Sequence, residues 1–180
     1  MRHHGEKFTM SAIVKRCSVA AVLAIAVLLP SFGELQTSEA GLRLIADLEG
    51  CRLSPYQCSA GVWTQGIGHT AGVIPGKTID ERQTAVGLVD DVRRTERGMA
   101  ACLPHTLSQQ TYDAVIAFAF NVGISAACHS TLVALLQQRQ WRQACDQLPR
   151  WIYVNGKKNK GLEQRRATER ALCLQGIASS

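Results

Sequence analysis

The sequence predicts an α+β protein in which a small β-sheet lobe joins a predominantly helical lobe, with a cleft between the two. The stretch from Cys51 to His69 is interrupted by proline and glycine and holds only short β-prone pieces, which is typical of a small irregular sheet. From residue 78 onward, apolar residues recur at helical spacing in several segments. With 180 residues, 46% hydrophobic and 19% charged, the chain has room for one ordinary domain and an additional segment.

The additional segment stands at the N-terminus. Residues 1–16 are polar and basic, and residues 17–29 form an apolar run that Pro30 ends. This order resembles the front of an export signal. The run is shorter than the roughly 20 residues that cross a bilayer comfortably, and Lys15 and Arg16 stand directly before it. We therefore expect a segment that can be exported but that anchors weakly.

Two interpretations of this segment stay open. It is either a cleaved signal peptide or an uncleaved signal-anchor that later leaves the membrane, and translation starts at Met1 or at Met10. Both interpretations place the rest of the chain outside the cytoplasm. We accordingly divide the chain into an N-terminal signal-anchor or signal segment, residues 1–36, and a globular domain, residues 37–180.

The first helices of the domain are predicted from their caps. The pair Thr37-Ser38 can cap a helix over residues 39–48, whose apolar residues share one face. The pattern Thr78-x-x-Glu81 is a capping box and predicts a long helix that ends near Ala101.

A second capping-box pattern, Thr106-x-x-Gln109, precedes residues 112–122. This segment is too apolar for a surface helix, so we expect it to be the central helix of the domain. Shorter helices are expected over residues 130–138, 140–148 and 162–174.

The formal charge of +6 favours a polyanionic partner. The sequence has no zinc-finger spacing, no paired RNA-binding aromatics and no arginine-rich arm, so we expect no nucleic-acid partner. The strongest basic groups are residues 156–161 and the pair Arg165-Arg166. These groups either form a loop and a helix face that are simply exposed to solvent, or they attract an anionic glycopeptide.

Seven cysteines are many for a cytosolic protein without a metal. Their spacing forms no zinc-binding pattern, so we expect neither a metal site nor a cofactor. Disulfides formed in an oxidising compartment explain them better, and the odd count leaves at least one thiol over. The four C-terminal cysteines allow three pairings. Cys145 and Cys173 stand on late helices that can pack together, which would leave Cys102 with Cys128.

The most specific motif begins at Glu49. Cys58 follows nine residues later and Thr64 six residues after that, and then comes the turn Gly66-Ile-Gly-His69. Further matching segments are residues 118–123, 130–132, 141–151 and 161–170. Together they resemble the phage lysozyme family, glycoside hydrolase family 24, over about residues 40–176. The resemblance implies a lysozyme-like fold and hydrolysis of the β-1,4 bond between N-acetylmuramic acid and N-acetylglucosamine in bacterial peptidoglycan.

Cleavage of a glycosidic bond requires a carboxylic acid that protonates the leaving oxygen, and a second group on the opposite face. Glu49 matches the family's acid, and its place at the end of an apolar helix favours partial desolvation and a raised pKa. The resemblance implies that Thr64 holds water or the anomeric region of the substrate. It also implies that the saccharide groove is lined by Phe120, Thr131 and Gln147. Structural contacts rather than chemistry are expected from His69, Arg166 and Glu169.

Most family members have Asp where this chain has Cys58. A neutral thiol replaces a carboxylate poorly, but a thiolate is a good nucleophile. The arrangement is similar to that of the cysteine-dependent signal-arrest-release endolysins of temperate phages, whose regulatory cysteines match Cys17, Cys51 and Cys58. The resemblance implies that a Cys51–Cys58 disulfide blocks the tethered enzyme, and that Cys17 attacks Cys51 after release and expels Cys58.

The same resemblance implies a cellular route. The chain would be exported, tethered on the periplasmic side of the inner membrane, and then released into the periplasm, where peptidoglycan is its substrate. A functional association with a holin is implied as well, and we expect a monomer.

Three functional interpretations stay open for the sequence alone. The chain is an active muramidase, a wall-binding protein with the same fold and no turnover, or a lytic transglycosylase, which uses one Glu and no second carboxylate. Turbidity loss of purified walls separates the second from the others, and reducing-end against anhydro-sugar products separates the first from the third. Retention or inversion at the anomeric carbon is open too, because Cys58 can attack the sugar or place a water.

Overall fold

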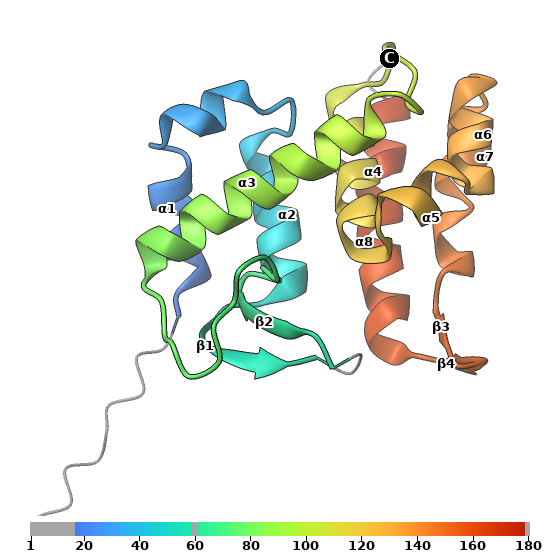
Figure 1. Ribbon diagram of the computed structural model, residues 1–180. Coiled ribbons are helices and arrows are strands. Elements are labelled where there is room, and N and C mark those ends of the chain that lie inside the picture. Colours follow the sequence, from blue (N-terminus) through green and yellow to red (C-terminus); the bar gives the residue numbers. More distant parts are fainter. Residues whose placement is uncertain (1–16, 59–60, 179–180) are drawn as a thin grey trace, which may run out of the picture.

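Eight α-helices, two short 3-10 helices and two small antiparallel hairpins make up residues 17–58 and 61–178, the part of the chain that the computed structural model describes (Figure 1). They confirm the α+β fold class. In chain order the elements are α1 Val19–Ala26, η1 Pro30–Glu34, α2 Glu39–Glu49, β1 Arg52–Gln57, β2 Trp63–Gly66, α3 Glu81–Met99, α4 Gln109–Val122, α5 Ile124–Cys128, α6 Thr131–Gln137, α7 Trp141–Cys145, η2 Leu148–Arg150, β3 Tyr153–Val154, β4 Lys157–Lys158 and α8 Lys160–Ala178.

The small lobe is the hairpin of β1 and β2, which lies at the lower ends of α2 and α3 in Figure 1. Tyr56 pairs with Thr64, and the register shifts between Arg52 and Tyr56, so the sheet is irregular as expected. The helices α4 to α8 form the larger lobe, and β3 and β4 form a second hairpin beside the first turn of α8. The predicted division into a sheet lobe and a helical lobe is therefore confirmed.

Both predicted capping boxes were placed two residues too early. The cap of α3 is Asp80, whose carboxylate accepts from Gln83 N at 2.7 Å while Asp80 N donates to Gln83 Oε1 at 3.1 Å. The cap of α4 is Ser108. In each case a later side chain reaches the N–H group three residues ahead, and that bond decides where a helix begins.

The predicted helix over residues 140–148 is also shorter than expected. It ends at Cys145, and the 3-10 turn η2 follows with Pro149 inside it. Proline has no N–H to continue an α-helical bond pattern, so the chain tightens into a 3-10 turn there. The last helix, α8, is longer than expected and runs from Lys160 to Ala178.

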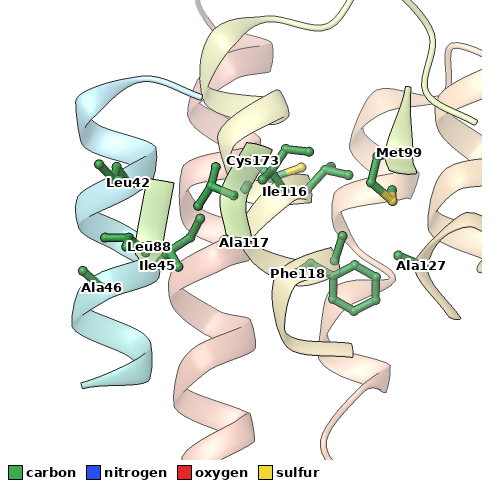
Figure 2. Close-up of a cluster of buried hydrophobic side chains, with 14 of the residues drawn as sticks. Leu42, Ile45, Ala46, Leu88, Met99, Ile116, Ala117, Phe118, Ala127 and Cys173 are labelled. Atoms are coloured by element: carbon green, nitrogen blue, oxygen red, sulfur yellow. The ribbon is translucent and has the colours of Figure 1, made fainter. Parts of the chain in front are cut away.

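The central helix is α4, as the sequence predicted. Its residues 113–119 are all buried. Figure 2 shows side chains from α2, α3, α4 and α8 meeting around it, among them Leu42, Leu88, Ile116 and Cys173. A core that draws on four helices holds the ends of α2 and α8 at fixed positions, and the candidate site lies at those ends.

Two disulfides reinforce the helical lobe. Cys145 of α7 is joined to Cys173 of α8, and Cys102, which follows α3, is joined to Cys128 of α5. Of the three pairings that the sequence left open, this is the one the structure contains. Each bridge ties a short late helix to a long one, and such a bridge stabilises a domain by about 2–4 kcal/mol.

The N-terminal apolar segment is packed against the domain. The helix α1 lies on α3, and Val22, Leu23 and Ala26 are fully buried in the common core. Within residues 17–58 and 61–178, no helix is both long enough and apolar enough to span a membrane. The predicted cap at Thr37-Ser38 stands at the junction between this segment and the domain.

Two buried carboxylates hold that junction. Glu96 Oε1 accepts hydrogen bonds from the backbone N and the Oγ1 of Thr37, both at 2.6 Å. Asp113 accepts from Ser38 N at 3.0 Å and from Ser38 Oγ at 2.5 Å. Ser38 is the N-cap of α2, so these bonds fix the start of the helix that ends at Glu49.

Substitution of Gly41 tests this junction. A Cβ at Gly41 would lie 2.6 Å from Asp113 Cγ, so Gly41→Ala must displace the carboxylate that holds Ser38. We expect the free energy of unfolding in urea to fall by about 1–3 kcal/mol despite the better helix propensity of alanine. The control is Gly33→Ala, where a Cβ has nothing within 4 Å. Equal stability of the two variants would contradict this account of the junction.

Candidate active site

Glu49 is the last residue of α2, and the positive φ of Gly50 turns the chain away directly after it. The Glu49 side chain is 19% exposed, so the expected partial burial is confirmed. The structure adds a partner that the sequence analysis missed: Arg165 Nη1 donates to Glu49 Oε1 at 2.8 Å. The carboxylate therefore lies at the junction of α2 and α8.

Arg165 belongs to a buried charge network on α8. Its Nε donates to Glu169 Oε1 at 3.0 Å, and its Nη2 donates to the carbonyl of Ala117 in α4 at 3.2 Å. Arg166 pairs with Glu169 as well, which confirms the structural ion pair expected for these two residues. The spacing of four between Arg165 and Glu169 is the signal that could have placed Arg165 on the same helix face.

Burial dominates the electrostatics of this network. Glu169 and Arg166 are almost fully buried. Burial raises the pKa of the Glu169 carboxyl, against the lowering effect of the two arginines, and it lowers the pKa of Arg166. The charged state of each group is thus stabilised by its neighbours, and the network fixes the position of α8 next to Glu49.

The other oxygen of Glu49 faces a different set of residues. A Cβ built on Gly68 would lie 3.3 Å from Glu49 Oε2 and 3.4 Å from Phe120 Cε1. The turn after β2, the end of α2 and the end of α4 therefore converge at one place. This convergence brings Phe120, a predicted groove residue, next to the predicted acid.

Cys58 and Thr64 lie on the hairpin of the small lobe. The backbone N of Cys58 donates to the carbonyl of Val62 at 3.0 Å, and Thr64 Oγ1 donates to the same oxygen at 3.1 Å. Thr64 is buried, with 5% of its surface exposed. The two predicted residues are therefore close neighbours, held by one shared acceptor.

His69 makes the structural contact expected of it. Its Nδ1 lies 2.7 Å from Asp91 Oδ2 on α3, so it joins the small lobe to the long helix. Gly87 on α3 leaves room for the imidazole ring. The bond fixes the turn that carries Gly68 and hence the wall beside Glu49 Oε2.

Thr131 and Gln147 lie in the unit of α6 and α7. Thr131 is the exposed first residue of α6, and Gln147 follows α7, where it bonds to Gln143 and Arg150. Their part in lining the saccharide groove stays a prediction.

A pocket of about 930 Å³ adjoins the pair of Glu49 and Arg165. It opens between the end of α2, the β3–β4 hairpin and the first turns of α8. Its lining combines apolar, amide, hydroxyl and charged side chains, and consists of Asp47, Leu48, Val154, Asn159, Gly161, Leu162, Gln164, Arg165, Ala167 and Thr168.

One disulfide joins the N-terminal segment to this region. Cys17, just before α1, is bonded to Cys51, and their Cα atoms are 5.4 Å apart. Cys51 stands two residues after Glu49. Cys58 lies outside the three disulfides of the described chain.

A partly buried carboxylate at the junction of a small sheet lobe and a helical lobe, with an aromatic ring beside it, defines a lysozyme-like glycoside hydrolase. The phage lysozyme family model matches residues 46–169. The chain belongs to this family, and it is an enzyme of the lysozyme type.

Individual relatives agree with this assignment. The SAR-endolysin of Escherichia phage P1 is 33% identical over 179 residues, which cover 91% of this chain and 93% of the relative. The crystal structure of the active form of the P1 endolysin superposes with a TM-score of 0.80, at 33% identity over 90% of this chain and 96% of that one. The secreted inactive form of the same endolysin gives a TM-score of 0.52, at 34% identity over 78% of this chain and 97% of that one.

The charge network gives a stability prediction. Arg165→Met leaves Glu49 without its arginine and Glu169 with only one, all in a buried setting, so we expect the free energy of unfolding to fall by about 3–5 kcal/mol. Arg170→Met on the same helix removes a pair with Asp146 whose side chains are 40% and 41% exposed. It should cost less than about 1 kcal/mol. Urea unfolding measures both, and similar small losses would contradict the structural role of Arg165.

Proposed function

We propose that this chain is an endolysin that hydrolyses the β-1,4 bond between N-acetylmuramic acid and N-acetylglucosamine in bacterial peptidoglycan. We further propose that membrane release and disulfide exchange control it. The observation that carries the regulatory part is the Cys17–Cys51 disulfide, formed while α1 is packed on the domain. The peptidoglycan substrate is supported by the family and by endolysin relatives.

Glu49 is the proposed general acid, and the structure favours one of its oxygens. Oε1 is occupied by the N–H of Arg165, whereas Oε2 lies on the side of Gly68 and Phe120. We assign the transferable proton to Oε2, because that oxygen faces the convergence of the two lobes. Arg165 would then steady the carboxylate that remains after the proton passes to the leaving oxygen.

Cys58 and Thr64 are the proposed groups on the other face of the scissile bond. The hairpin holds them next to each other through the Val62 carbonyl. As a thiolate, Cys58 supplies the negative charge and the nucleophilic atom that an aspartate supplies elsewhere in the family. Thr64 would orient water or the substrate by its hydroxyl, and Phe120, Thr131 and Gln147 would bind the saccharide chain.

The proposed switch is a thiol–disulfide exchange. In the tethered enzyme, Cys51 is bonded to Cys58. After release, the Cys17 thiol loses its proton to solvent and its sulfur attacks Cys51 Sγ. A Cys17–Cys51 bond forms, the Cys51–Cys58 bond breaks, and the electron pair leaves with Cys58 as a thiolate. The step consumes one disulfide and forms one, so no oxidant is required.

The location of the enzyme follows from the same proposal. We propose that residues 1–36 first tether the domain, residues 37–180, to the periplasmic side of the inner membrane, and that the monomeric enzyme is later released to the periplasm beside a holin. The SAR-endolysin relatives support this route. The burial of Val22, Leu23 and Ala26 supports it too, because the domain offers these apolar side chains a second environment.

Glu49→Gln tests the chemistry. The amide cannot donate a proton as an acid does, so we expect the initial rate of turbidity loss of purified cell walls to fall by at least about 100-fold. Glu39→Gln, the exposed first residue of the same helix, is the matched control and should keep its activity. New reducing ends should accompany lysis by the wild-type chain. Anhydro-sugar products would contradict the proposed hydrolysis, and an active Glu49→Gln variant would remove Glu49 from the acid role.

Cysteine variants test the switch. Cys17→Ser should give an exported, folded and inactive enzyme, because nothing can displace Cys58 from Cys51. Adding Cys51→Ser to it should restore lysis, since Cys58 then has no disulfide partner at that position. Activity is followed by cell lysis after expression, and the bonds by thiol trapping and peptide mass spectrometry. Full activity of Cys17→Ser alone would contradict the proposed exchange.

A further inference from the structure

The helix α1 is apolar on every side. Residues Val19–Ala26 are only valine, alanine, leucine and isoleucine. The hydrophobic effect is not directional, so such a helix could pack against the domain in several rotations about its own axis. In the structure one rotation is taken, with the side chains of Val22, Leu23 and Ala26 buried. A directional contact is the kind of interaction that selects one rotation over the others.

Such a contact lies at the N-terminus of α1. Ser18 is the N-cap, and its Oγ accepts a hydrogen bond from Ala21 N at 3.2 Å. The backbone N of Ser18 donates to Glu81 Oε1 at 2.9 Å. Glu81 is the first residue of α3, so its carboxylate lies at the N-terminal ends of two helices, where a negative charge is favourable. The contact is one residue away from Cys17.

We infer that Glu81 is a positioning residue for the disulfide exchange: it binds Ser18 N–H, sets the register of α1 and so presents Cys17 to Cys51. A slip of one residue would turn α1 by about 100° and shift it by about 1.5 Å. The Cα atoms of a disulfide must stand within about 4.4–6.8 Å of each other, and here they are 5.4 Å apart. This inference rests on the exchange proposed above.

A second contact holds the other end of the segment without setting this register. Arg93 Nη1 of α3 donates to Glu34 Oε2 at 2.8 Å. The turn at Pro30 lies between Glu34 and α1, so this ion pair fixes the path of the chain but not the rotation of the helix. Arg93 therefore provides a comparison: it docks the segment on the same helix, at a distance from Cys17.

The test measures how readily Cys17 and Cys51 pair in the full chain. Variants are equilibrated in glutathione buffers, and the Cys17–Cys51 bond is quantified by thiol trapping and peptide mass spectrometry. The equilibrium in glutathione gives the effective concentration of the Cys17 thiol at Cys51. Loss of one hydrogen bond in Glu81→Ala should lower this effective concentration by about threefold to tenfold. Glu81→Gln keeps an oxygen acceptor but loses the charge, so its loss should be smaller than that of Glu81→Ala. Glu39→Ala, the equivalent first residue of α2, is the control and should have no effect.

A stability measurement separates positioning from folding. Because Glu81 begins α3, its removal can also lower the melting temperature, and Glu81→Ala in a Cys17→Ser background measures that part alone. An effective concentration in Glu81→Ala within about twofold of the wild type overturns the inference. So does an equal loss in Arg93→Met, which would assign the effect to general docking. A wild-type chain that never forms Cys17–Cys51 would instead contradict the exchange itself.

Discussion

The candidate site depends on one contact, the hydrogen-bonded ion pair between Arg165 and Glu49. Arg165 connects the end of α2 to α8 and reaches the backbone of α4, so three helices that are distant in sequence meet at one guanidinium. Buried ion pairs contribute little net stability relative to apolar packing, because both charges lose their water. Their geometry, however, is specific. The network fixes the direction of the Glu49 carboxylate, and it leaves one oxygen on the side where the lobes converge.

The second partner of the acid is held by a much weaker part of the fold. Cys58 directly follows β1 in a hairpin of two short strands, and its backbone N donates to the carbonyl of Val62. An isolated two-stranded hairpin is marginally stable, so the proposed change of disulfide at Cys51 would disturb less structure here than in the helical lobe. The rigid helical lobe therefore carries the proposed acid, and the smaller lobe carries Cys58, the group that the proposed exchange would release. This division matches the different demands of catalysis and control.

Much of the site could be predicted from sequence, because spacing reports local structure. The resemblance to the phage lysozyme family singled out Glu49, Cys58 and Thr64, and the local pattern predicted the elements that carry them: an apolar helix that ends near Glu49 and a glycine-rich hairpin with Cys58 and Thr64. The helix starts were misplaced by two residues, since Asp80 and Ser108, two residues after the predicted threonine caps, are the side chains that accept from the N–H groups of Gln83 and Thr111. Arg165 was missed because its contact with Glu49 spans 116 residues of sequence, and no local pattern encodes such a pair.

In the proposed release, the N-terminal segment has to suit two environments, the membrane and the protein core, and its composition fits both. A helix meant only for a protein core would be apolar on one face, whereas α1 is apolar throughout and leaves Leu28 just after it 82% exposed. A helix meant only for the bilayer would be longer. A short segment that is apolar throughout therefore fits the proposed tether and release. What it lacks is a preferred face, and the polar contact of Ser18 with Glu81 at its N-terminus supplies that orientation beside Cys17.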